Sequence, residues 1–95
     1  MSASGPEPMP RHLKSERSMK CSGYAVSSSE MVELAEITIQ ADPDVLRKLA
    51  DFIRQCADDI EVHGDAWEHE HFQDSPLSES VDCRTDIVVF RRITE

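Results

Sequence analysis

The segment DPDVLRKLADFIRQCADDIEVHG, residues 42–64, decides the fold because it carries a full set of helix signals. Asp42 is a good N-cap, Pro43 suits the first helical position, and Asp44 complements the positive end of the helix dipole. Gly64 marks the stop, where a left-handed conformation is needed after a helix. Apolar residues recur at intervals of three and four, which predicts one buried stripe along the helix. The stripe comprises Leu46, Leu49, Ile53, Cys56 and Ile60, flanked by Val45, Phe52 and Ala57.

The segment before the helix predicts a strand. In MVELAEITIQ, residues 31–40, apolar side chains alternate with polar ones at Ala35, Ile37 and Ile39. One face of this strand is apolar, so we expect it to lie against the helix.

Two further strands are predicted after the helix. Residues 67–72 (WEHEHF) alternate with a period of two, and residues 86–93 (DIVVFRRI) include a stretch that is apolar on both faces, which favours a central strand. Between them, residues 73–85 contain Pro76 and several Ser and predict a loop. The sequence therefore predicts an α+β fold, a small β-α-β-β domain whose three-stranded sheet carries one long helix on one face.

The first part of the chain has a different composition. Residues 1–29 are rich in Ser, Pro, Gly and Met and poor in large apolar side chains. Such a stretch buries too little surface to offset its ordering entropy, so we expect a disordered arm over residues 1–29 and the folded domain over residues 30–95.

Charge divides along the same boundary. Four Lys and Arg against two Glu give residues 1–29 a net charge of +2, whereas seventeen acids against six bases give the remainder −11. Phosphate contacts need clustered cations, so a folded part this acidic argues against nucleic acid as its ligand. It favours a basic protein partner.

Cysteine usage and hydropathy narrow the class further. The three Cys lack CxxC spacing and predict neither a disulfide framework nor a structural zinc site. We find no signal-peptide pattern and no run of about 18 apolar residues that could span a membrane. We expect a cytoplasmic protein without cofactors that has no membrane partner.

The strongest functional feature is a region without cations. Between Gln55 and Cys83 there is no Lys or Arg but there are nine Asp and Glu, three of them near the helix C-terminus, where carboxylates oppose the dipole. Local rules broken repeatedly in one place often indicate function, so we predict a docking surface for a cationic partner. Its candidate residues are Asp58, Asp59, Glu61, Asp65, Trp67, Glu68, Glu70 and Asp74.

Several alternatives stay open. The acidic region is also compatible with a merely solvated face, and Trp67 with an ordinary core residue. His69 and His71 share a strand face and could be two ligands of a metal ion, although the sequence fixes no third ligand. The two-faced apolar segment, residues 87–90, allows a weak homodimer as well as a monomer.

Catalysis is disfavoured. Cys56 lies on the apolar stripe, where a thiol is usually inert, and Cys83 lies in an acidic loop, an environment that does not favour a reactive thiolate. The chain has no Gly-rich phosphate loop, GxSxG or HExxH motif.

Three segments carry a resemblance to a known family. LAEITIQADPDVLRKLADFIRQCA, then GDAWEHEHFQD, then DIVVFRR, within residues 34–92, resemble the immunity protein 32 family of bacterial polymorphic-toxin systems. The resemblance implies an antidote that binds and neutralises a cognate toxin without catalysis, and it brings no catalytic residues with it. Many such toxins are nucleases with cationic clefts, which an acidic antidote could occupy by imitating phosphate.

Overall fold

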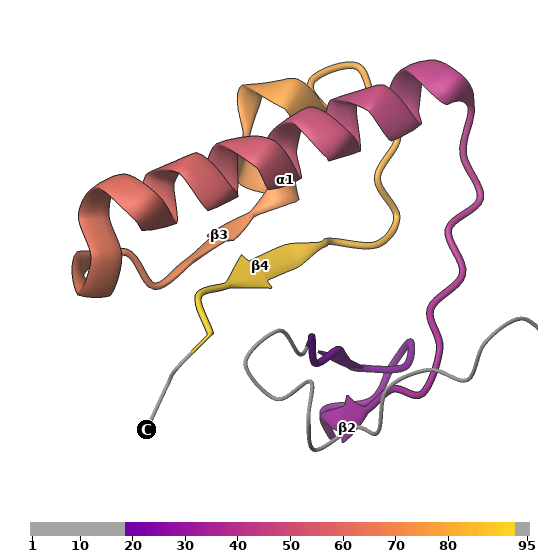
Figure 1. The fold of residues 1–95 in the computed structure, drawn as a ribbon. Helices are drawn as coiled ribbons and strands as arrows, with labels where there is room; N and C mark the ends of the chain where they lie inside the picture. Colours follow the sequence, from indigo (N-terminus) through magenta and orange to yellow (C-terminus); the bar gives the residue numbers. More distant parts are fainter. Residues whose placement is uncertain (1–18, 93–95) are drawn as a thin grey trace, which may run out of the picture. The chain divides into compact units, whose positions relative to one another are not determined.

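The computed structural model describes residues 19–92, which fall into two compact units divided between Ile39 and Gln40. The long helix lies in the second unit (Figure 1). The predicted boundary between residues 29 and 30 stays a prediction. In residues 19–92, no helix is both long and apolar enough to cross a membrane.

The helix α1 (Pro43–His63) has the bounds that the sequence predicts. Asp42 is extended (φ −72°, ψ 161°) and its carbonyl accepts the N–H of Leu46 at 3.0 Å, although its side chain makes no capping hydrogen bond. Gly64 has φ +55°, a conformation that favours glycine, and its N–H donates to the carbonyl of Ile60. The chain then continues into the 3-10 turn η2 (Gly64–Ala66).

The buried stripe of α1 is narrower than predicted. Leu49, Phe52 and Cys56 are buried, with 7%, 2% and 3% of their surface exposed. Leu46 and Ile53, which we expected in the core, are 41% and 47% exposed. The helix covers a sheet of only two strands, so it buries the strip centred on Phe52 and leaves the adjoining apolar strip accessible.

That sheet consists of β3 (His69–His71) and β4 (Val88–Phe90), which run antiparallel. The register pairs His69 with Phe90, Glu70 with Val89 and His71 with Val88. Both strands lie within the predicted segments but are shorter. Within residues 19–92, β4 pairs only with β3, so the predicted central position of this strand is wrong.

The predicted strand over residues 31–40 is also largely wrong. Only β2 (Val32–Glu33) forms there, and it pairs antiparallel with β1 (Ser22–Gly23), a part of the predicted arm. The three-stranded sheet is thus corrected to two separate two-stranded sheets. Ile37 and Ile39 alternate with polar residues as expected but are 53% and 47% exposed. An alternating sequence forms a strand only where a second strand supplies backbone hydrogen bonds, and the alternation alone does not supply that partner. Residues 1–18 of the predicted arm lie outside the described residues.

The core of the second unit forms between α1 and the residues that follow it in the chain. Phe72 meets Phe52 edge to face, with ring centroids 5.2 Å apart and planes at 67°. The predicted loop contains two 3-10 turns, η3 (Phe72–Asp74) and η4 (Pro76–Ser78), and buries Ser75 between them. Partly buried apolar side chains complete the cluster: Trp67, Leu77, Val81, Cys83, Ile87 and Val89.

Candidate functional site

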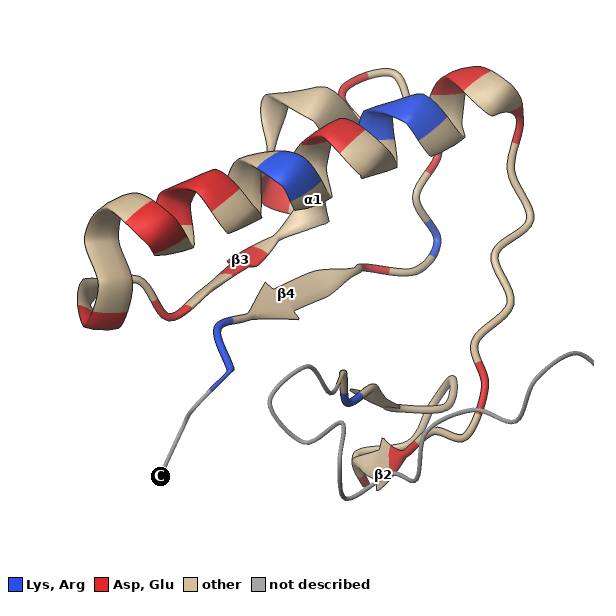
Figure 2. Ribbon diagram, viewed as in Figure 1, with Lys and Arg blue, Asp and Glu red and all other residues tan. Residues whose placement is uncertain are grey.

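Acidic side chains gather at one end of the second unit. Figure 2 shows Lys and Arg along the first part of α1, whereas its last turns, the following turn and β3 carry Asp and Glu. No Lys or Arg occurs between Arg54 and Arg84. All seven predicted carboxylates are exposed: Asp58, Asp59, Glu61, Asp65, Glu68, Glu70 and Asp74.

Two of these carboxylates are brought together by the packing of α1 on β3. Asp59, in the last turns of α1, and Glu70, at the centre of β3, line one small cavity of about 150 Å³. We call this cavity the notch. Its remaining lining residues are Phe52, Gln55, Cys56, Ser75 and Pro76.

Both carboxylates affect the pKa of the Cys56 thiol. Burial raises its pKa above the ordinary value, and the negative charges of Glu70 and then Asp59 raise that pKa further. The thiol is therefore held in its protonated form, which is a poor nucleophile. This agrees with the inert role that the sequence predicts for Cys56.

Two of the other predicted carboxylates, Asp65 and Glu68, have partners outside the notch. Asp65 Oδ1 lies 3.4 Å from Arg91 Nη1, and the Nε of Arg91 donates to the carbonyl of Trp67 at 2.8 Å. Glu68 Oε1 lies 2.9 Å from His69 Nδ1. Asp58, Glu61 and Asp74 are exposed but do not line the notch. The structure thus brings Asp59 and Glu70 to one cavity, and the other five predicted carboxylates do not line it.

Trp67 is half-buried and packs against the core cluster. Its backbone N–H donates to the carbonyl of Gly64 at 3.0 Å, which closes the turn after α1. The indole therefore contributes to the core. Its predicted role as an interface anchor stays a prediction.

The two histidines form an array on the face of the sheet opposite Glu70. His69 stacks on Phe90 with ring centroids 4.5 Å apart and meets His71 edge to face at 5.3 Å. The Nδ1 atoms of both imidazoles are engaged by carboxylates, Glu68 and Asp86 respectively. Over residues 19–92, no group of three or more His, Cys, Asp or Glu side chains is arranged to hold a metal ion.

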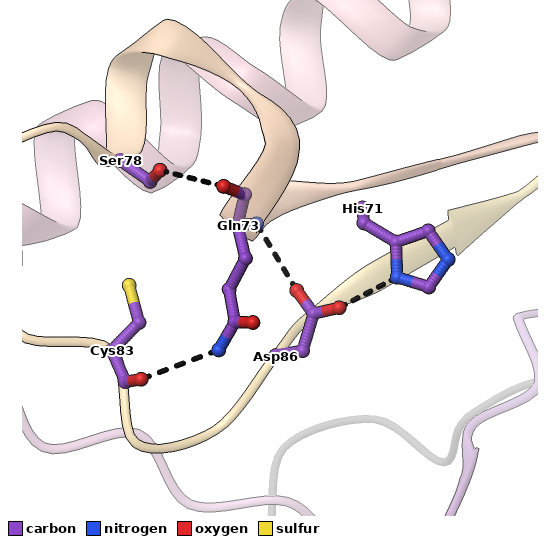
Figure 3. A network of polar contacts seen from close by, with 5 residues as sticks. All are labelled: His71, Gln73, Ser78, Cys83 and Asp86. Atoms are coloured by element: carbon purple, nitrogen blue, oxygen red, sulfur yellow. Dashed lines mark hydrogen bonds and ion pairs between the residues drawn. The ribbon is translucent and has the colours of Figure 1, made fainter.

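A polar network around Asp86, which the sequence did not reveal, anchors the segment between the strands (Figure 3). Asp86 Oδ2 lies 2.6 Å from His71 Nδ1, and its Oδ1 accepts the backbone N–H of Gln73 at 3.1 Å. The Gln73 amide donates to the carbonyl of Cys83 at 3.2 Å, and Ser78 Oγ donates to the carbonyl of Gln73. These residues are far apart in sequence, so no spacing rule predicts the network.

The network shifts two pKa values. The hydrogen bond to Asp86 raises the pKa of His71; partial burial opposes that shift, and the charges of Asp86, Asp74 and Glu70 add to it. Partial burial acts to raise the pKa of Asp86, but hydrogen bonds from His71, Gln73 and Ile87 outweigh it and leave this pKa below its ordinary value.

The comparison with known proteins gives a match over the part of the chain that carries these residues. The family model described as immunity protein 32 matches residues 36–92, a span that includes α1, β3 and β4. No curated protein and no solved structure matches the chain.

Proposed function

The chain belongs to the immunity protein 32 family, and from that premise we propose that it neutralises its toxin by covering a cationic surface with the acidic end of its second unit. Family membership makes the protein a toxin-binding component of a polymorphic-toxin system that acts without catalysis. The acidic surface and the basic character of the toxin are the proposed part.

The observation that carries this proposal is the separation of charge within the second unit. Seven exposed carboxylates follow one another from the last turns of α1 to η3, in a stretch of chain, residues 55–83, that contains no Lys or Arg. Of these seven, Asp65 lies 3.4 Å from the guanidinium of Arg91. A surface dominated by charges of one sign attracts an oppositely charged partner over roughly a Debye length, about 8–10 Å at ordinary salt concentrations. It also accelerates association.

The free-energy cost of placing carboxylates near the C-terminus of α1 supports a functional role for this surface. Asp58, Asp59 and Glu61 occupy the last turns of α1, where the helix dipole is negative. A carboxylate within the last turn, such as Glu61, costs about 0.3–1 kcal/mol at low salt. A cationic toxin surface would relieve this repulsion in the complex. A toxin that binds nucleic acid or another anionic substrate would present such a surface, and the carboxylates would occupy the substrate's place.

Charge reversal tests the proposal. The cognate toxin domain, inactivated so that it can be produced, is titrated with the wild-type protein and with the double variant Glu68→Lys/Glu70→Lys. We expect the double variant to bind at least about tenfold more weakly, and wild-type affinity to fall steeply with added salt.

The matched control is Glu30→Lys/Glu36→Lys, which changes the net charge equally at two exposed positions of the first unit. This control should bind within about threefold of wild type, since it leaves the acidic end intact. Equal weakening of toxin binding by both double variants would show that only the net charge of the protein matters. Unchanged affinity in both, without salt dependence, would remove the acidic mechanism.

A further inference from the structure

The notch combines an apolar floor with an acidic rim. Phe52 and Cys56 of α1 are 2% and 3% exposed and line its floor together with Pro76. Asp59 and Glu70 stand on opposite sides, one on the helix and one on the strand. No Lys or Arg lines the notch.

We propose that this notch receives one lysine or arginine side chain of the toxin, with its methylene stem on Phe52, Cys56 and Pro76 and its charged head between Asp59 and Glu70. The inference rests on the proposed function and deepens it, because it reduces an acidic surface to one defined contact. Long cationic side chains bury their stems on apolar surface while the head keeps polar partners, and the notch offers both.

The floor supplies an observation that is independent of the acids. Cys56 is almost fully buried, 3% exposed, and lines the notch. Ser75, also buried, lines the same cavity and uses its hydroxyl oxygen to accept the N–H of Leu77 at 3.1 Å. A thiol is a soft, weakly polar group that accommodates a methylene chain without losing a hydrogen bond.

The rim is electrostatically unsatisfied. Among the described residues, neither Asp59 nor Glu70 forms an ion pair. Their charges nevertheless reach the floor, since both raise the pKa of the Cys56 thiol. A cation in the notch therefore meets negative potential from both of its acidic side chains.

Size selects a single side chain. The cavity measures about 150 Å³, whereas sites for nucleotide-sized or drug-sized ligands measure roughly 300–1,000 Å³. A bare divalent ion is disfavoured, because in the described residues no three metal-ligating side chains converge. An elongated side chain with one positive charge fits both the volume and the charge of the notch.

The first experiment is independent of the toxin. The full chain is titrated with Nα-acetyl-arginine amide and with its neutral isostere, Nα-acetyl-citrulline amide, while amide resonances are followed by NMR. We expect saturable shifts centred on Cys56 and Glu70 with the arginine probe and at least about fivefold weaker binding of the citrulline probe. Shifts of equal affinity for both probes, or shifts spread evenly over the acidic end, would overturn the assignment.

Two double variants localise the contact. Asp59→Asn/Glu70→Gln removes both charges of the notch, whereas Asp58→Asn/Glu61→Gln removes two neighbouring charges of α1 that do not line it. All four replacements are close to isosteric, and unfolding by urea checks that both proteins remain folded. The notch variant should bind the arginine probe about fivefold more weakly than wild type, and the control should bind it within about twofold.

The same variants, bound to the inactivated toxin, separate this inference from the proposed function. Greater weakening by the notch variant than by the control supports the notch. Equal weakening by both would leave an acidic docking surface but overturn the single-side-chain contact. If neither double variant weakens the complex, the notch and the acidic surface both fail.

Discussion

His71 Nδ1 and Asp86 Oδ2 lie 2.6 Å apart and join β3 to the residue two positions before β4. The same carboxylate binds the backbone of Gln73, so one side chain fixes the strand, the turn after it and the return of the chain. The contact is partly exposed, and each partner shifts the pKa of the other, so it should give the second unit a pH-dependent stability.

Stability from this contact should depend on pH in a defined direction. The pKa of His71 is raised, so its contribution is fully present below the unfolded value of about 6.5 and is lost as pH rises through the folded pKa. The pKa of Asp86 is lowered, so its contribution is present above about 3.9 and is lost as pH falls through the folded pKa. The pair should therefore stabilise most between about pH 4 and pH 6.5.

Asp86→Asn gives the measurement. The difference in unfolding free energy between wild type and this variant, from urea titrations, should be larger at pH 5.5 than at pH 9. Comparing the two proteins at each pH cancels the titration of the other groups. A difference that stays constant over this range would show that the ion pair contributes no pH-dependent stability.

Replacing Phe52 with Ala should cost about 3–5 kcal/mol, because it empties a site at the centre of the core. Ile53→Ala is the matched control, one residue further along α1 and 47% exposed, and it should cost about 1 kcal/mol or less. Urea unfolding measures both, with Phe52→Leu as the milder variant if the alanine protein does not fold. Similar costs at the two positions would favour the wider stripe predicted from sequence.

Gly64→Ala should destabilise the protein by roughly 1 kcal/mol, because Gly64 has φ +55°. A Cβ at this position meets no atom within 4 Å, so the cost would come from the backbone and not from a clash. Gly64→Asn should cost about as much, since ψ −127° places Gly64 outside the left-handed helical region in which Asn is tolerated. Thermal unfolding ranks the three proteins, and an alanine variant as stable as wild type would contradict the strained C-cap.

The thiol of Cys56 should report the charge of the notch without any ligand. Asp59→Asn and Glu70→Gln should each lower its pKa, with the larger effect from Glu70, and burial should keep the pKa above its ordinary value in both variants. The Cβ chemical shift of Cys56, followed by NMR against pH, measures this directly. Asp58→Asn, which leaves the notch unchanged, should have little effect, and an equal shift in that variant would contradict the assigned geometry.

The sequence predicts the helix well and the sheet poorly, for a physical reason. Each end of α1 depends on residues within one turn of that end, Asp42 and Pro43 at the start and Gly64 at the finish. Both ends can therefore be predicted from local sequence. Strand pairing depends on a distant partner. Val32 and Glu33 pair with residues 22–23 and not with β3 or β4, which the alternation of residues 31–40 could not reveal.

The candidate site divides in the same way. Composition predicts that carboxylates dominate this end of the chain, and Asp59 and Glu70 were both among the candidates. Their position across one notch depends on how α1 rotates over β3, and the predicted stripe had that rotation wrong by placing Ile53 in the core. Asp86 was missed because its partner His71 lies 15 residues away, on β3.

The half-buried Trp67 gives the protein a built-in optical reporter. It is the sole indole in the sequence, and it joins the turn that carries Asp65 to the hydrophobic cluster beneath α1. Its emission spectrum should therefore respond both to loss of the native packing and to a toxin settling on the neighbouring carboxylates. Unfolding and complex formation can thus be followed in the unlabelled protein.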